Sequence, residues 1–80
     1  MNAQLQRFLS ASYAEMVLGH AVGQARAVWS QNKDDQTFID AAKAELKRIN
    51  GLGLSNSNLQ QRDFASYQNL RALTQALGST

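Results

Sequence analysis

The chain has 80 residues, none of which is cysteine or proline, and its formal net charge is +2. Eighty residues make one small domain at most, which excludes α/β barrels and doubly wound enzymes. The lack of cysteine excludes disulfides and thiolate metal sites. Twelve of the apolar residues are alanine, so few large side chains are available for a core. We expect a single domain over residues 1–80 that gains stability from self-association or from a partner.

The chain carries no pattern typical of membranes or export. Its longest run of large apolar residues is Met16, Val17 and Leu18, far short of the ~20 residues that span a bilayer. No apolar signal region with a small-residue cleavage site follows the early Arg7. We therefore expect a cytoplasmic protein that does not contact a membrane.

The composition favours helices throughout. Alanine, leucine and glutamine are abundant, and only five residues are β-branched aliphatics. Helix-stop and helix-start residues coincide near residues 31–34 and 51–57. The sequence predicts a small all-α domain of three helices: a long helix over about 2–31, followed by a helical hairpin over about 35–50 and 58–77.

The predicted helices differ in how clearly their ends are marked. In the first, Ser12 and Glu15 have capping-box spacing. The sequence therefore leaves open whether this helix is continuous or divides into two at a joint near Ser10–Ser12. The second begins at Asp34 and Asp35, whose carboxylates can cap free N–H groups. We expect it to end on a left-handed Gly51, with Leu52 folded back on Leu46.

The third helix has a second capping-box spacing at Ser57 and Gln60, and it should stop at Gly78. Its apolar residues form one core-facing stripe, and so do those of the second helix. Phe64 projects off the edge of the third helix's stripe. The stripes comprise Phe38, Ile39, Ala42, Leu46 and Ile49, and Leu59, Tyr67, Leu70, Leu73 and Leu77.

The first predicted helix has two apolar faces where a three-helix bundle needs one. Gly19, Gly23 and Ala27, spaced by four, would let another helix approach closely. We infer that one face meets something outside the chain. One face consists of Ala14, Val17, Leu18, Ala21, Val22, Ala25, Val28 and Trp29, and the other of Leu5, Leu9, Tyr13, Met16, His20, Gly23 and Ala27.

Nothing in the sequence indicates catalysis, a cofactor, a metal or a small-molecule substrate. His20 is the only histidine and lacks a ligand at metal-site spacing, so we expect it to be partly buried and hydrogen-bonded. Residues 32–40 offer oxygen ligands, but Thr37 and Lys43 stand where a calcium loop needs glycine and glutamate. No nucleophile with a base assembles.

One segment resembles the turn of a helix-turn-helix DNA-binding unit, here within residues 41–77. Leu52, Gly53, Leu54 and Leu59 match its apolar and glycine positions, whereas Ile49 stands where that motif has a small residue. The resemblance implies base contacts from the last helix and phosphate contacts from the one before it. These residues would be Gln61, Arg62, Gln68 and Asn69 for bases, and Lys43, Lys47 and Arg48 for phosphates.

The surplus apolar face favours a non-catalytic protein-interaction module, an assembly subunit or small regulator that binds its own copies or another protein. DNA binding is the alternative. Trp29 and Phe64 are candidate aromatic anchors, although both could equally close the ends of the core. The expected partner-binding residues are Leu9, Tyr13, Met16, His20, Trp29 and Phe64.

Overall fold

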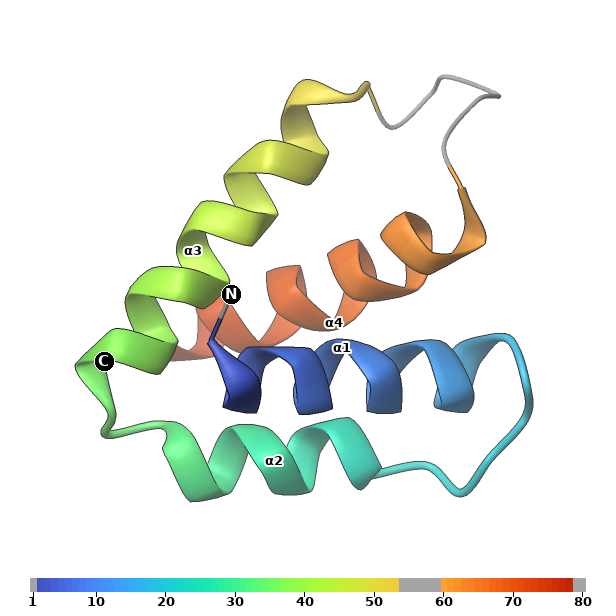
Figure 1. Ribbon diagram of the computed structural model, residues 1–80, viewed down its shortest axis with the longest axis horizontal. Helices are drawn as coiled ribbons and strands as arrows, with labels where there is room; N and C mark the ends of the chain where they lie inside the picture. Colours follow the sequence, from blue (N-terminus) through green and yellow to red (C-terminus); the bar gives the residue numbers. More distant parts are fainter. Residues whose placement is uncertain (1, 54–59, 79–80) are drawn as a thin grey trace.

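Helices form all the regular structure of the residues described. The computed structural model describes residues 2–53 and 60–78, and within them the chain forms four α-helices and no strand (Figure 1). The all-α helical bundle predicted from composition is confirmed. The helices are α1 (Ala3–Met16), α2 (Gln24–Asn32), α3 (Gln36–Gly51) and α4 (Gln61–Gly78).

The first two helices form an antiparallel pair, and the last two pack on one side of it. In Figure 1, α1 and α2 lie side by side, α3 runs away from them at an angle, and α4 passes behind α1. Contacts join α1 to each of the other three helices, and α4 also contacts α3. One side of the α1–α2 pair is therefore covered by the rest of the chain.

Three aromatic rings meet at the centre of the core. The ring centroids of Phe8 and Trp29 are 5.6 Å apart, and Phe38 lies 5.4 Å from Trp29 and 6.3 Å from Phe8. Trp29 is only 5 % exposed. It therefore belongs to the core and is not an interface anchor. The other buried members of this cluster are Leu5, Ala25, Ala42, Ile49 and Leu70.

The expected helix over 2–31 is interrupted. The chain leaves helical geometry after Met16 and resumes it at Gln24, because Gly19 (φ 72°) and Gly23 (φ 107°) take the left-handed conformation that glycine tolerates best. A Cβ added at either glycine would have no heavy atom within 4 Å. These glycines thus terminate and restart helices, so the expected row of Gly19, Gly23 and Ala27 along one helix is broken.

The joint near Ser10–Ser12 that the sequence left open is absent, because α1 is continuous over Ala3–Met16. Ser12 is buried inside α1, where its hydroxyl donates to the Phe8 carbonyl at 2.9 Å. Glu15 does not close a capping box with Ser12. Its carboxylate instead accepts a hydrogen bond from the backbone N–H of Ala25 at 2.7 Å.

Helix α3, which the sequence predicted as the second helix, starts as predicted and ends differently. The Asp35 carboxylate accepts from the N–H groups of Thr37 and Phe38, which confirms the cap. Gly51 remains helical, and the left-handed residue is Gly53, with φ 80°. The expected left-handed Gly51 is therefore wrong: the helix continues to Gly51, with Leu52 as its C-cap.

The last helix places its stripe against the core as expected. Leu70 is buried, and Tyr67 and Leu73 pack against the core cluster. Phe64 projects off this stripe and is 43 % exposed. Ser57 with its capping box, Leu59, and the side chain of Leu77 lie outside the described residues, so the predictions made for them stay predictions.

Candidate protein interface

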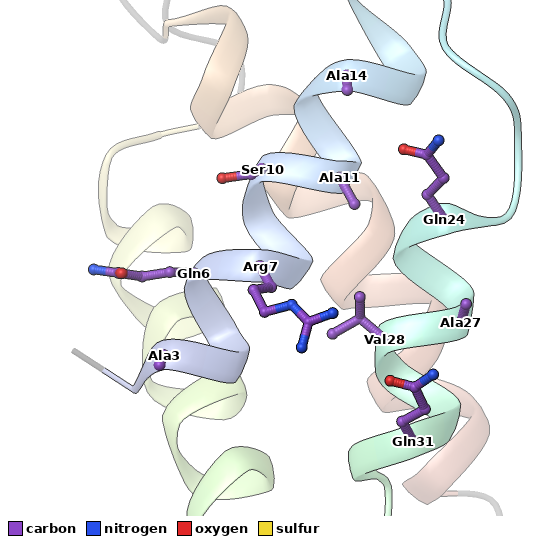
Figure 2. Close-up of a pocket in the computed structure, with 10 residues that line it drawn as sticks. All are labelled: Ala3, Gln6, Arg7, Ser10, Ala11, Ala14, Gln24, Ala27, Val28 and Gln31. Carbon is purple, nitrogen blue, oxygen red and sulfur yellow. The ribbon is translucent and has the colours of Figure 1, made fainter.

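An open groove runs along the outer side of the α1–α2 pair. It has a volume of about 820 Å³ and lies on the side that Figure 2 shows with its lining residues as sticks. Both helices contribute side chains at helical spacing. The lining consists of Ala3, Gln6, Arg7, Ser10, Ala11 and Ala14 from α1, and Gln24, Ala27, Val28 and Gln31 from α2.

The groove combines a floor of small residues with neutral polar edges. Alanine methyl groups and Val28 offer little bulk, so another backbone can come close. The amides of Gln6, Gln24 and Gln31 can both donate and accept hydrogen bonds. Arg7 is the one charged residue in the lining; it reaches from α1 towards α2 (Figure 2), and its Nη1 donates to Gln4 Oε1 at 3.3 Å.

Beyond one end of the groove, the last residue of α1 and the connection to α2 expose apolar side chains. Met16, Leu18 and Val22 are exposed, and Val22 is 93 % exposed. Several exposed apolar residues within one short segment mark a contact surface more strongly than a single one does. The groove and this connection together form the outer surface of α1–α2.

The residues predicted to bind a partner do not form one face. Leu9 packs against the core and Trp29 belongs to it. Tyr13 is partly buried, with the Arg62 guanidinium 4.9 Å from its ring centroid. Met16 and Phe64 are exposed.

His20 is exposed as well, so the expectation that it is partly buried is wrong. The two-faced wheel also fails, because it requires an unbroken helix through Val17–Gly23. The chain leaves helical geometry there, so the angular positions after the break no longer continue those before it.

A second, smaller cleft lies where α1, α3 and α4 meet. It has a volume of about 340 Å³ and is lined by charged and hydroxyl side chains. Arg48 bridges Glu45 of α3 and Asp63 of α4, the latter at 2.9 Å. Hydrogen bonds to Glu45 and then to Asp63 raise the pKa of Arg48, so it stays charged. The residues that line this cleft are Gln6, Leu9, Ser10, Glu45, Arg48, Arg62, Asp63 and Ser66.

The residues of the DNA-binding alternative have mixed surroundings. Lys43, Lys47, Gln61 and Gln68 are exposed. Arg48 is held by two carboxylates, Arg62 lies over Tyr13, and Asn69 Nδ2 donates to the Ala65 carbonyl at 3.4 Å. Residues 54–59, which include most of the proposed turn, lie outside the described residues. DNA binding stays a prediction.

Residues 2–53 and 60–78 contain neither a metal-ligand cluster nor a membrane-spanning helix. No three histidine, aspartate or glutamate side chains gather there as metal ligands would, and none of the helices has the length and apolar character of a membrane span. No family model, curated protein or solved structure matches the chain. Function is therefore inferred from the surface geometry alone.

The groove lining cannot be read from a helical wheel of residues 2–31, because such a wheel assumes one continuous helix. A signal is nevertheless present in the sequence, since Ala3, Arg7, Ser10 and Ala14 share one face of a helix. The matching face of α2 can be aligned with it only once the break at the two glycines is known.

Proposed function

We propose that this chain is a non-catalytic protein-interaction module that holds an α-helix of a protein partner in the groove between α1 and α2. The observation that carries the proposal is the open groove itself, about 820 Å³ in volume and uncovered along the antiparallel pair. Binding of an amphipathic helix between two others is a recurring mode of recognition.

The chemistry of the lining supports a helix as the occupant. Helices pack with axes ~8–10 Å apart, and the shortest separations need small side chains at the contact. Ala11, Ala14 and Ala27 provide these. The amides of Gln24 and Gln31 stand at the α2 edge, where they can bond polar side chains that flank an apolar seam on the incoming helix.

The exposed connection extends the same surface. Leu18 and Val22 offer apolar area that the chain's own core leaves uncovered. Buried apolar area is the main favourable contribution to protein association, and a few apolar anchors usually dominate it. Loss of contact at this end should therefore weaken binding.

Photo-crosslinking in the cells that make the protein tests this proposal. A benzophenone amino acid is placed at Gln24, on the groove edge, or at Gln68, an exposed position on α4. We expect protein adducts at position 24 and none, or far fewer, at position 68. Mass spectrometry of the adduct identifies the cross-linked chain.

A pair of alanine substitutions provides the matched control. Ala27→Arg should block the groove and remove most of the adduct formed at position 24, whereas Ala44→Arg, on an exposed part of α3, should leave it unchanged. Far-UV circular dichroism checks that both variants stay helical. Equal adducts at positions 24 and 68, or none at either, would contradict the proposal.

A further inference from the structure

The cleft between α1, α3 and α4 contains polar groups that the fold leaves without a partner. Glu45 is 9 % exposed and Ser66 is 6 % exposed. Arg48 donates only to Oε1 of Glu45, so among the described residues neither Glu45 Oε2 nor the Ser66 hydroxyl has a hydrogen-bond partner. Every fully buried side-chain oxygen in this part of the chain has one. These two oxygens are therefore accessible, and the cleft is lined by both residues.

The two arginines of the cleft differ in what they contact. Arg48 already bridges Glu45 and Asp63. The Arg62 guanidinium lies 4.9 Å from the ring centroid of Tyr13, and it has no carboxylate or other hydrogen-bond partner within the described ranges. Arg62 therefore keeps its N–H donors for an anion. A carboxylate suits it, because guanidinium and carboxylate groups form paired hydrogen bonds.

We propose that this cleft binds a small zwitterion that carries both an ammonium group and a carboxylate, as a free α-amino acid does. Arg62 holds the carboxylate, and Glu45 Oε2 accepts a hydrogen bond from the ammonium group. The two arginines and the two carboxylates in the lining cancel in formal charge. A ligand without net charge therefore leaves no unpaired charge in this partly buried site.

The remaining lining residues suit the same class of ligand. The hydroxyls of Ser10 and Ser66 and the amide of Gln6 both donate and accept hydrogen bonds, and Leu9 adds an apolar wall for an aliphatic side chain. Figure 2 shows Gln6 and Ser10 on the side of α1 that faces away from α2. The volume of about 340 Å³ is near the lower end for small-molecule sites, which favours a single amino acid over a larger ligand.

An NMR titration of the ¹⁵N-labelled chain with three related compounds tests the proposal. L-Leucine has both charged groups, isoamylamine is the same molecule without the carboxylate, and 4-methylpentanoate is the same molecule without the ammonium group. We expect saturable shifts at Ser10, Arg62 and Ser66 with L-leucine. Each analogue should bind at least about tenfold more weakly, because it loses one charge-assisted hydrogen bond.

Substitutions on α4 provide a matched pair. Arg62→Gln should weaken L-leucine at least about tenfold, whereas Arg71→Gln should leave it unchanged. Arg71 is the appropriate control because it also lies over a tyrosine ring, 5.8 Å from the centroid of Tyr67, but does not line the cleft. Ser66→Ala keeps a good helix former and should weaken L-leucine by a smaller factor, about twofold to fivefold.

Glu45→Gln tests the ammonium side of the site. It removes the charge that pairs with the ammonium group, so it should weaken L-leucine and leave the already weaker 4-methylpentanoate unchanged. Both ligands are measured on the same variant, so a general loss of structure would affect them alike. Far-UV circular dichroism checks that each variant stays helical.

Three results would overturn the inference: no saturable shift with L-leucine up to ~20 mM, equal binding of the three compounds, or equal losses in Arg62→Gln and Arg71→Gln. The photo-adduct expected at Gln24 does not depend on this cleft. A failed titration therefore leaves the proposed helix groove intact, and absence of the adduct leaves the zwitterion site intact.

Discussion

At the scale of single residues, one aromatic side chain from each of α1, α2 and α3 sets how those helices meet. Phe8 and Phe38 meet edge-on at 82°, and Trp29 lies at 70° to Phe38. Tilted and edge-to-face pairs add about 0.5–1.5 kcal/mol each beyond the burial of area. In a chain with so few large apolar residues, these contacts are a substantial part of the stability, and Trp29 fluorescence reports on their integrity.

Two glycines act at the same scale by a different mechanism, since they affect the backbone rather than the packing. Gly19 and Gly23 have positive φ, whereas Gly51 lies in the last turn of α3. A methyl group added at any of the three would have no heavy atom within 4 Å. A substitution by alanine at these sites therefore measures backbone conformation without a steric clash.

We predict opposite signs for two such substitutions. Gly23→Ala should lower the free energy of unfolding by about 1–2 kcal/mol, because alanine is strained at φ 107°. Gly51→Ala should raise it by up to ~1 kcal/mol, because alanine is the better helix former. Urea denaturation at one fixed protein concentration, followed by Trp29 fluorescence, measures both. Changes of the same sign would contradict the conformational argument.

At the scale of elements, α2 depends on a side chain from another helix for its N-terminal cap. Its N-cap residue, Gly23, has no side chain to accept a hydrogen bond, and Glu15 at the end of α1 supplies the carboxylate. A negative charge there also interacts favourably with the positive end of the helix dipole. The same contact fixes the register of α1 against α2, and hence the pairing of the residues that line the groove.

We predict that Glu15→Ala destabilises α2 selectively. The loss of the cap should cost about 1 kcal/mol and speed hydrogen exchange at the Ala25 amide, which loses its acceptor. Glu15→Gln keeps an acceptor oxygen and removes only the charge, so its effect should be smaller. NMR-detected exchange measures both. Unchanged protection at Ala25 in Glu15→Ala would show that the contact contributes nothing.

The α3–α4 junction shows which of two effects dominates between elements. Arg48 bridges Glu45 and Asp63, but half of its side chain is exposed, and solvent-screened pairs of this kind contribute only about 0–1 kcal/mol. Leu70 of α4 is fully buried against the core cluster, which stabilises by roughly 1.5–3 kcal/mol. Apolar packing therefore holds α4 in place, and the Arg48–Asp63 ion pair links its first turn to α3.

At the scale of the whole molecule, the thin core and the open outer surface have the same cause. The apolar side chains of α1 and α2 point towards α3 and α4, and the opposite side of the pair presents alanines and amides. A domain of this length buries too little surface to be strongly stable alone. Burial of the α1–α2 surface against a partner would add buried apolar area at the place where the fold leaves it exposed.

If the helix held by the groove belongs to a second copy of the chain, coupling of association to folding predicts a thermal midpoint that depends on protein concentration. For a dimer, each tenfold increase in concentration adds about 0.7 kcal/mol per chain, which raises the Tm by ~3–5 °C in a domain of this size. Circular dichroism melts over a dilution series measure it. Ala44→Arg should keep the dependence and Ala27→Arg should abolish it, whereas a constant Tm in the unmodified chain would argue against a folded dimer.

Local chemistry determined the fold class and the best-marked helix. Absence of proline and abundance of helix formers act within each segment, so the all-helical structure follows from composition. The Asp35 cap and the stripe of Phe38, Ala42 and Ile49 involve neighbours along the chain, and the structure has them as predicted. An interaction between residues a few positions apart can be identified without knowledge of the rest of the fold.

The tertiary structure alone decided where the first helix breaks and which surface is left open. Gly19 and Gly23 are compatible with either a close helix contact or a turn, and the choice depends on how α2 folds back onto α1. The Glu15 carboxylate accepts a hydrogen bond from the backbone N–H of Ala25, which lies ten residues along the chain and across that turn. The groove exists only because two helices lie side by side, and such pairing depends on contacts that no periodicity within one segment encodes.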